Sequence, residues 1–310
     1  MAIFLTNDDV RGLLSMTECV EVLDDLFRQE ADGLVENIPR VRRKFEGGGS
    51  ATLMGGVVLG SKAYGVRNSE HSLLYDTDSG RLEAVIEPSA VARTRTGGAS
   101  GVATRYMATS DASVVGCVGT GRQAGAQLQA MCTVRPISLV KVYSRSAEKR
   151  EAFAAEMTEL LGVEVRAVAS TEECIGGSPI VVVMTNSSVP VFDGALLEAG
   201  THVNAAGANS YARREVDETT IVRSDLVVVD NIAQAKTECG ELMAAADRGA
   251  FRWGAAVDLH EVVSGKTSGR PTPEWITLFE SQGIGIEDVA CYQYVTRKAR
   301  DLGVGQELPF

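Results

Sequence analysis

The spacing of hydrophobic positions changes along the chain, and each change predicts a different kind of structure. Between residues 6 and 32, apolar positions recur every three or four residues, which is the spacing of helices buried on one face. We predict two helices there, beginning at the capping residues Thr6 and Thr17, with Gly33 ending the second.

Residues 40–87 have a different pattern, in which short apolar runs are separated by glycines and polar turns. The segment 76–80, DTDSG, is typical of a hairpin turn. We predict an antiparallel sheet or part of a barrel. The expected strands are RVRRKF (40–45), ATLMGGVVLG (51–60), SKAYGV (61–66), HSLLYD (71–76) and RLEAVIE (81–87).

After Asp111, continuous Val and Ile runs alternate with segments of helical spacing. Strands without polar alternation are buried on both faces, as in a parallel sheet covered by helices. The expected strands lie in 113–119, 138–144, 179–185, 201–207 and 225–230, and the expected helices begin at Arg122 and span 147–162, 193–200, 213–225 and 234–249.

These patterns predict an α/β protein with a doubly wound Rossmann domain and a smaller α+β domain for substrate binding and dimerisation. We place the smaller domain at residues 1–110 and the dinucleotide-binding domain at residues 111–285. The last helical segment, 286–303, lies beyond the alternation, and we expect residues 286–310 to complete the smaller domain.

Composition excludes several classes of function. The net charge of −11 argues against nucleic acid or an anionic membrane as the main partner, although a local arginine cluster can still bind a small anion. The N-terminus is not typical of a signal peptide, since two aspartates follow within nine residues. The six cysteines have no C-x-x-C spacing, so we expect reduced thiols in a cytoplasmic protein. With three histidines in the chain, we expect no histidine-based metal site.

A glycine motif follows the first strand of the alternating region. The segment VGTGRQA reads G-x-G-x-x-A, in which Gly119 permits a tight turn, Gly121 a close backbone approach and Ala124 close helix packing. At a strand-to-helix turn this motif is typical of a dinucleotide pyrophosphate site. The candidate cofactor contacts are Thr96, Gly119, Thr120, Gly121, Arg122, Gln123, Ser144, Arg145, Ser146, Thr185, Ala206 and Gly207.

The end of the second strand favours NADP over NAD. NAD sites carry an acid there for the ribose, whereas this strand ends in Ser144, Arg145 and Ser146. Arginine between two hydroxyls suits a 2′-phosphate, and a solvated surface arginine is the alternative interpretation.

The segment RTGGASG, residues 95–101, carries little bulk. One interpretation is that a helix begins at Thr96 and presents its N-terminus to the cofactor pyrophosphate, while Arg95 reaches the substrate. The alternative is tight helix–helix packing through small residues, which would leave Arg95 without a role.

Together with GTGRQA, the segment RTGGASGVATRYMA resembles the ornithine cyclodeaminase/μ-crystallin family, which includes archaeal-type alanine dehydrogenases and reductases of cyclic imino acids. The likeness extends over nearly the whole chain, through PRVRR, GSKAY, LLYDTDSGRLEAVIE, THVNAAGANSYARREVD and TLFESQGIGIEDVA. It implies a homodimer formed through the strand-rich domain.

The resemblance also implies a substrate site. In the family, an arginine, a lysine and a second arginine surround the carboxylate and amine of the substrate, and the matching positions are Arg40, Lys62 and Arg95. Arginine offers a two-donor fork for a carboxylate, and a partly desolvated lysine can supply a proton. Weaker candidates for substrate contact are His71, Ser281 and Gln282.

One position departs from the cyclodeaminases, which carry an aspartate after N-A-x-G-x. Asn209 stands there, and a neutral amide cannot act as a general base. We therefore expect an NAD(P)-dependent oxidoreductase that interconverts an α-imino acid and an L-amino acid. The alternatives are an ammonia-lyase that uses tightly bound NAD and a non-catalytic binding protein.

Overall fold

The computed structural model describes residues 1–309. They form two compact units, which we call the first unit (residues 1–98 and the segment from residue 284 onward) and the second unit (residues 99–283). The sequence pattern suggested a boundary near residue 110. The structure instead divides within the helix α3 (Pro88–Met107), whose first half belongs to one unit and whose second half belongs to the other.

The described part of the first unit contains one seven-stranded sheet, in the order β15-β1-β6-β5-β4-β3-β2. Neighbouring strands are antiparallel except for the parallel pair β1 and β6. The strands are β1 (Ile3–Leu5), β2 (Val35–Lys44), β3 (Ser50–Val58), β4 (Ala63–Arg67), β5 (Ser72–Asp76), β6 (Leu82–Ile86) and β15 (Gln306–Glu307). The short helix η1 (Leu59–Ser61) joins β3 to β4.

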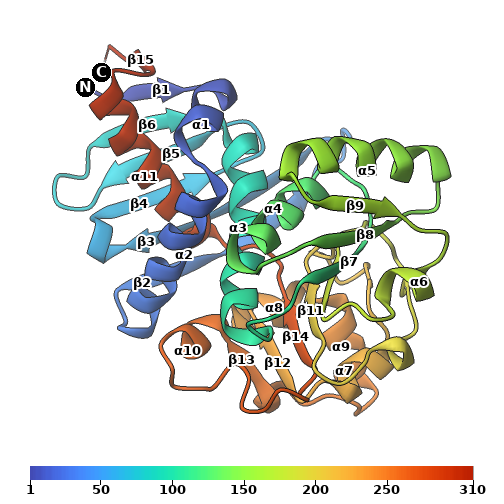
Figure 1. Cartoon of the computed structure of the whole chain (residues 1–310). Helices are drawn as coiled ribbons and strands as arrows, with labels where there is room; N and C mark the ends of the chain where they lie inside the picture. The colour runs from blue at the N-terminus through green and yellow to red at the C-terminus, as the bar shows by residue number, and fades with distance from the viewer. Residues whose placement is uncertain (310) are drawn as a thin grey trace. The chain divides into compact units, whose positions relative to one another are not determined.

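Helices α1 (Asn7–Leu13), α2 (Met16–Ala31) and α11 (Gly285–Leu302) belong to the same unit. Thr6 caps α1 as predicted, but α2 begins earlier than predicted because Ser15, not Thr17, forms a capping box with Glu18. Helix α11 lies across the sheet and packs on β3 and β4, which explains why this last segment returns to the first unit (Figure 1).

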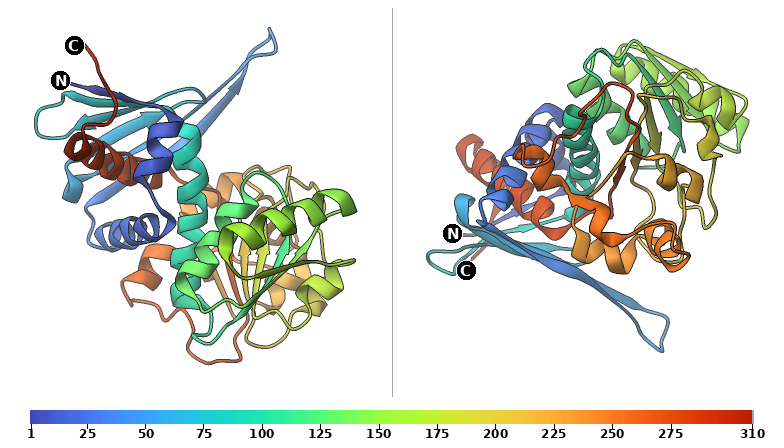
Figure 2. Two further views of the ribbon diagram at one scale, coloured as in Figure 1. Left: turned by 45° about the horizontal axis from the view of Figure 1, so that its top comes forward. Right: turned by 90° about the horizontal axis from the view of Figure 1, so that it is seen from below.

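Strands β2 and β3 continue past the other strands as a long two-stranded arm (Figure 2). The arm carries exposed apolar side chains, among them Val41, Phe45 and Leu53. A folded monomer in water gains nothing from such exposure, so this surface is a candidate for protein contact.

The second unit confirms the predicted doubly wound fold. Within residues 99–283, eight parallel strands have the order β13-β12-β14-β11-β10-β7-β8-β9. The strands are β7 (Val114–Val118), β8 (Leu139–Tyr143), β9 (Glu164–Ala167), β10 (Ile180–Val183), β11 (His202–Ala205), β12 (Leu226–Val229), β13 (Ala256–Asp258) and β14 (Thr277–Glu280). Every residue of β10, β11, β12 and β14 is buried, as continuous apolar strands require.

The helical elements of the second unit are shorter than the sequence suggested. They are α4 (Ala124–Val134), α5 (Ala147–Leu161), α6 (Thr171–Ile175), η2 (Gly194–Leu196), α7 (Glu218–Arg223), α8 (Ile232–Glu238), α9 (Gly240–Asp247), η3 (Trp253–Ala255) and α10 (Leu259–Val263). The predicted helix at 193–200 is a single turn, and the one at 234–249 breaks at Cys239.

All six cysteines lie in the described part of the chain and are free thiols. None of the described helices is both long and apolar enough to span a bilayer.

Candidate active site

The glycine motif lies where the sequence places it, between β7 and α4. Gly119 has a φ of 112°, and a Cβ there would collide with the carbonyl oxygen of Met184. At Gly121 a Cβ would meet nothing within 4 Å, so open space adjoins this backbone. The turn therefore needs glycine at position 119 for its backbone conformation, and it leaves open space beside Gly121.

The N-terminus of α4 has the features of an anion site. Its N-cap residue, Gln123, forms no capping hydrogen bond. Within the described residues, the backbone N–H groups of residues 120–123 donate no hydrogen bond. Unpaired N–H groups at a helix N-terminus attract phosphate, so these residues fit a dinucleotide pyrophosphate.

The end of β8 presents the arginine that the sequence singled out. Arg145 is exposed and forms no hydrogen bond or ion pair with any described residue. Ser144 accepts a hydrogen bond from the Thr120 hydroxyl (3.1 Å), which ties this turn to the glycine motif, and Ser146 caps α5. A guanidinium with all its donors available thus stands beside the strand end.

A buried carboxylate joins the ends of β10 and β11. Glu215 is fully buried, and its two oxygens accept hydrogen bonds from the backbone N–H groups of Thr185 and Gly207, the second at 2.6 Å. Gly207 packs so closely that a Cβ would collide with the Thr185 backbone. Ala206 donates its backbone N–H to Val183 (3.0 Å). Sequence reasoning missed Glu215, although it listed all three residues of these strand ends.

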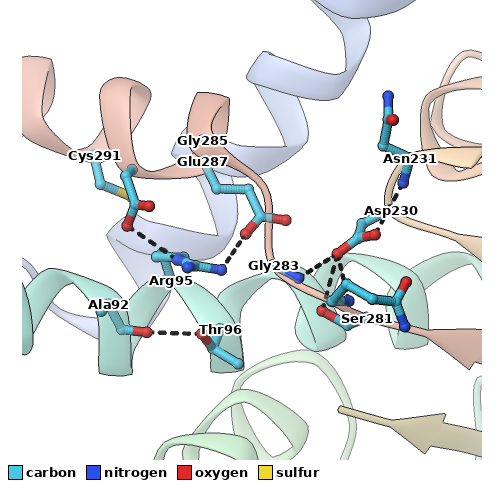
Figure 3. A network of polar contacts seen from close by, with 12 residues as sticks. Ala92, Arg95, Thr96, Asp230, Asn231, Ser281, Gly283, Gly285, Glu287 and Cys291 are labelled. Carbon is cyan, nitrogen blue, oxygen red and sulfur yellow. Dashed lines mark hydrogen bonds and ion pairs between the residues drawn. The ribbon is translucent and has the colours of Figure 1, made fainter. Parts of the chain in front are cut away.

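A second buried acid orders the segment that follows β14. The carboxylate of Asp230 accepts hydrogen bonds from the Ser281 hydroxyl (3.3 Å) and from the backbone N–H groups of Gln282 (2.8 Å) and Gly283 (2.6 Å) (Figure 3). Ser281 and Gln282 are both buried. The Ser281 hydroxyl is thus engaged within the protein, and substrate contact by either residue stays a prediction.

Further carboxyl groups are buried at the same edge of the sheet. Ligand atoms of Cys239, Glu241 and Glu280 lie within 4.8 Å of one another. The Cys239 thiol donates to Glu280 (3.5 Å), and Glu241 accepts from the Glu215 backbone N–H (3.0 Å). Burial raises the pKa of Glu215 and of Glu241 to about 7 and that of Glu280 well above its usual value.

Lys62 is not the desolvated lysine that we expected. It is the one non-glycine residue with positive φ (56°) in the described chain, and its side chain is exposed at the turn before β4. Its ammonium group pairs with Asp78 at 2.5 Å, and this hydrogen bond raises its pKa. Because the ammonium group is held by Asp78 at an exposed turn, the role of Lys62 as proton donor stays a prediction.

Arg95 is buried in an ion-pair network of the first unit. Its side chain is 5% exposed, Nη1 donates to Glu287 (2.7 Å), and Nε donates to Asp288 (3.1 Å) (Figure 3). Arg67, which sequence reasoning missed, approaches Asp288 from β4. The signal available in the sequence was the adjacent acid pair in IGIEDVA.

The prediction that a helix begins at Thr96 is wrong. Helix α3 begins at Pro88, so Thr96 lies in mid-helix and its hydroxyl donates to the Ala92 carbonyl at 2.7 Å (Figure 3). A Cβ on Gly98 would lie 2.7 Å from the Cys19 sulfur and 3.0 Å from a Leu23 methyl. Tight packing on α2 therefore accounts for this glycine, as the alternative interpretation proposed.

The chain matches the ornithine cyclodeaminase/mu-crystallin family over residues 1–303. It belongs to this family.

Among solved members of the ornithine cyclodeaminase/mu-crystallin family, three are closely similar in structure. The Δ1-pyrroline-2-carboxylate reductase of Thermococcus litoralis, in complex with NADH and L-proline, has a TM-score of 0.94 and 32% identity, covering 99% of this chain and 100% of that one. An archaeal alanine dehydrogenase dimer with bound NAD has a TM-score of 0.91 and 31% identity, and the match covers 100% of this chain and 99% of that one. The iminosuccinate reductase of Paracoccus denitrificans, in complex with NAD⁺, has a TM-score of 0.93 and 25% identity, and the match covers 100% of this chain and 99% of that one.

The remaining candidate site residues lie partly in the first unit and partly in the second. Arg40 is half-buried in β2, and His71 is exposed in the turn between β4 and β5. Arg122 is exposed beside the glycine motif. Asn209 is half-buried in the loop that follows β11, so the position of the cyclodeaminase aspartate is occupied by a neutral amide.

Proposed function

We propose that this protein is a nicotinamide-dependent oxidoreductase that interconverts an α-imino acid and an L-amino acid. The observation that carries the proposal is the open, uncapped phosphate turn before α4, in a chain whose relatives include imine reductases and an alanine dehydrogenase. When bound, a reduced nicotinamide supplies the hydride. The protein binds the cofactor, orients the imino acid and controls one proton.

Residues 119–123 would hold the pyrophosphate, with Arg145 on a 2′-phosphate. Arg145 has no protein partner among the described residues, and β8 has no acid at its end. Both features support a preference for NADP(H), with NAD(H) as the alternative.

The proposed substrate residues of the first unit are Arg40, Lys62 and Arg95. In the second unit, Asn209 is proposed to contact the substrate. Lys62 is charged and paired with Asp78, so it would have to leave this partner before it could give a proton to a substrate. Asn209 can hold an amine or a water by hydrogen bonding but cannot remove a proton near neutral pH. This favours reduction over the ring-closing loss of ammonia.

Two further features of the proposal concern assembly and location. The exposed apolar side chains of the β2–β3 arm support a homodimer, and a related alanine dehydrogenase is a dimer. The six free thiols support a cytoplasmic location.

A spectrophotometric screen tests the function. NADPH and NADH are each followed at the absorbance band of the reduced nicotinamide, with Δ1-pyrroline-2-carboxylate, with iminosuccinate, and with pyruvate plus ammonia or methylamine. Stoichiometric cofactor oxidation with one of these imines is expected. Ammonia release from ornithine under NAD, without net cofactor change, would instead identify a lyase. Cofactor binding without turnover on any substrate would identify a binding protein.

A further inference from the structure

The first turn of α11 is fixed against β2 and β3 by close backbone contacts. A Cβ on Gly285 would collide with the backbone of Gly55. A Cβ on Gly56 would likewise collide with the side chain of Ile286. The backbone N–H of Gly285 also donates to the side chain of Asn37 at 3.0 Å. Side chains on this turn therefore start from a backbone that has little freedom to move relative to the sheet.

This turn carries two adjacent acids, and both hold Arg95. Nη1 of the arginine donates to Oε2 of Glu287 at 2.7 Å (Figure 3). Nε donates to Oδ1 of Asp288 at 3.1 Å, and both acid side chains are buried. The guanidinium group is planar, so fixing two of its nitrogens also fixes the direction of the third, Nη2.

The same contacts leave part of the Arg95 guanidinium available to a ligand. The group has five N–H donors, and the two acids engage one on Nε and one on Nη1. The second hydrogen of Nη1 and both hydrogens of Nη2 have no partner among the described residues. Because Nη1 and Nη2 are neighbours, together they offer a carboxylate a two-donor fork.

Arg67 balances the charge of this network. It lies in β4, and its Nη1 donates to both oxygens of Asp288 at 3.1 and 3.2 Å. Burial acts to raise the pKa of Asp288, but the two guanidinium groups lower it overall, so this carboxylate is charged. Two acids and two arginines carry no net charge together, which allows Asp288 to hold Arg95 as a buried anion.

We propose that Glu287 and Asp288 are positioning residues, which hold Arg95 with its Nη1–Nη2 edge directed at the carboxylate of the imino-acid substrate. Arg67 supports them by neutralising Asp288. This inference rests on the proposed function, in which Arg95 belongs to the substrate site. It gives the first turn of α11 a part in substrate recognition.

The test compares the imino acid that the wild type reduces with the same imine without its α-carboxyl group, such as 1-pyrroline for Δ1-pyrroline-2-carboxylate. For each variant the ratio of the two kcat/KM values measures recognition of the carboxylate. Where the second imine reacts too slowly, inhibition constants of L-proline and pyrrolidine give the same comparison.

Glu287→Gln keeps the size of the side chain but loses the charge that holds Nη1 of Arg95. We expect the ratio to fall about tenfold, mainly through a higher KM for the carboxylated imine. The dissociation constant of the reduced cofactor should match that of the wild type. Glu83→Gln is the matched control, since Glu83 is a partly exposed acid that pairs with Arg300 in the same unit. The control should leave the ratio unchanged.

Asp288→Asn alone leaves two buried arginines with one acid, so this variant is prone to misfold. The double variant Asp288→Asn/Arg67→Gln removes one charge of each sign and restores the balance. It should bind the cofactor like the wild type and still show the lowered ratio, because Nε of Arg95 has lost its carboxylate partner.

A wild-type ratio in both Glu287→Gln and the double variant overturns the positioning role. An equal loss with the two imines also overturns it, because that pattern indicates general damage to the protein. A wild-type protein that reduces no imine at all refutes the proposed function itself, and this inference with it.

Discussion

Glu215→Gln removes half of the link between β10 and β11 while keeping the size of the side chain. The carboxylate accepts two backbone hydrogen bonds, from Thr185 and Gly207, whereas an amide has one oxygen and turns its NH₂ group toward the other N–H. Leaving one buried donor without an acceptor costs about 1–3 kcal/mol. At pH 5 the Glu215 carboxyl of the wild type is mostly protonated, but its hydroxyl oxygen can still accept a hydrogen bond, which an NH₂ group cannot. We therefore expect a loss of stability of that size at pH 5.

The pH dependence of the free energy of unfolding provides a second, independent magnitude for the effect of Glu215. Burial raises the pKa of Glu215 to about 7, against 4.5 for the unperturbed group, although the Thr185 and Gly207 hydrogen bonds act to lower it. The folded protein therefore holds this proton more tightly than the unfolded chain does. Stability falls as the pH rises from about 4.5 through 7, and the full difference is about 3 kcal/mol. Glutamine does not titrate, so between pH 5 and pH 9 the difference in stability should shift by about that amount in favour of the variant, which removes or reverses its deficit.

The assay is chemical unfolding at pH 5, 7 and 9, combined with amide hydrogen exchange at Thr185 and Gly207. Glu218→Gln is the control, since Glu218 lies three residues away with a side chain that is 40% exposed and paired with Arg248. The control should change stability little at any pH. A difference between wild type and Glu215→Gln that stays constant with pH would refute the linkage. Unchanged exchange at both amides would refute the bridging role.

Three other substitutions test the proposed cofactor and substrate sites. Arg145→Ala should weaken NADPH binding by about 1.5–3 kcal/mol and leave NADH binding unchanged in fluorescence titrations, and an equal loss for both would contradict the 2′-phosphate assignment. Lys62→Met should lower turnover by about two to four powers of ten with unaltered cofactor affinity. Near-wild-type kinetics would leave Lys62 as the surface partner of Asp78. The wild type should release little ammonia from ornithine under NAD, whereas Asn209→Asp should impair imine reduction. Robust ammonia release by the wild type would speak against the reductase.

Features governed by local sequence were predicted well. The glycine motif lies at the end of β7, Thr6 caps α1, and the segment around Gly80 turns between β5 and β6. In each case the residue type itself limits the backbone, through a positive φ, a side-chain cap or a tight turn. Family membership was also predicted correctly, because its motifs extend along most of the chain.

Features governed by distant contacts were not predictable in the same way. The start of α3 was misplaced by eight residues, because Arg95 and Thr96 resemble residues at a helix start and the pattern gives no sign that the helix already began at Pro88. Glu215 and Asp230 were overlooked because most of their partners are backbone N–H groups of segments that follow other strands. Such partners have no sequence signature, since any residue except proline supplies an N–H group.

The two arginines of the first unit show why residue type alone cannot identify a carboxylate site. Arg95 and Arg67 carry the same group, and the family motif points to Arg95. What distinguishes them is the acid pair on the first turn of α11, which engages two nitrogens of Arg95 and one of Arg67. Asp288 lies 193 positions from Arg95 and 221 from Arg67 along the chain, so the packing of α11 on the sheet decides how many nitrogens of each guanidinium are engaged within the protein. The donors that an arginine keeps for a ligand are thus set by the fold and not by the residue type.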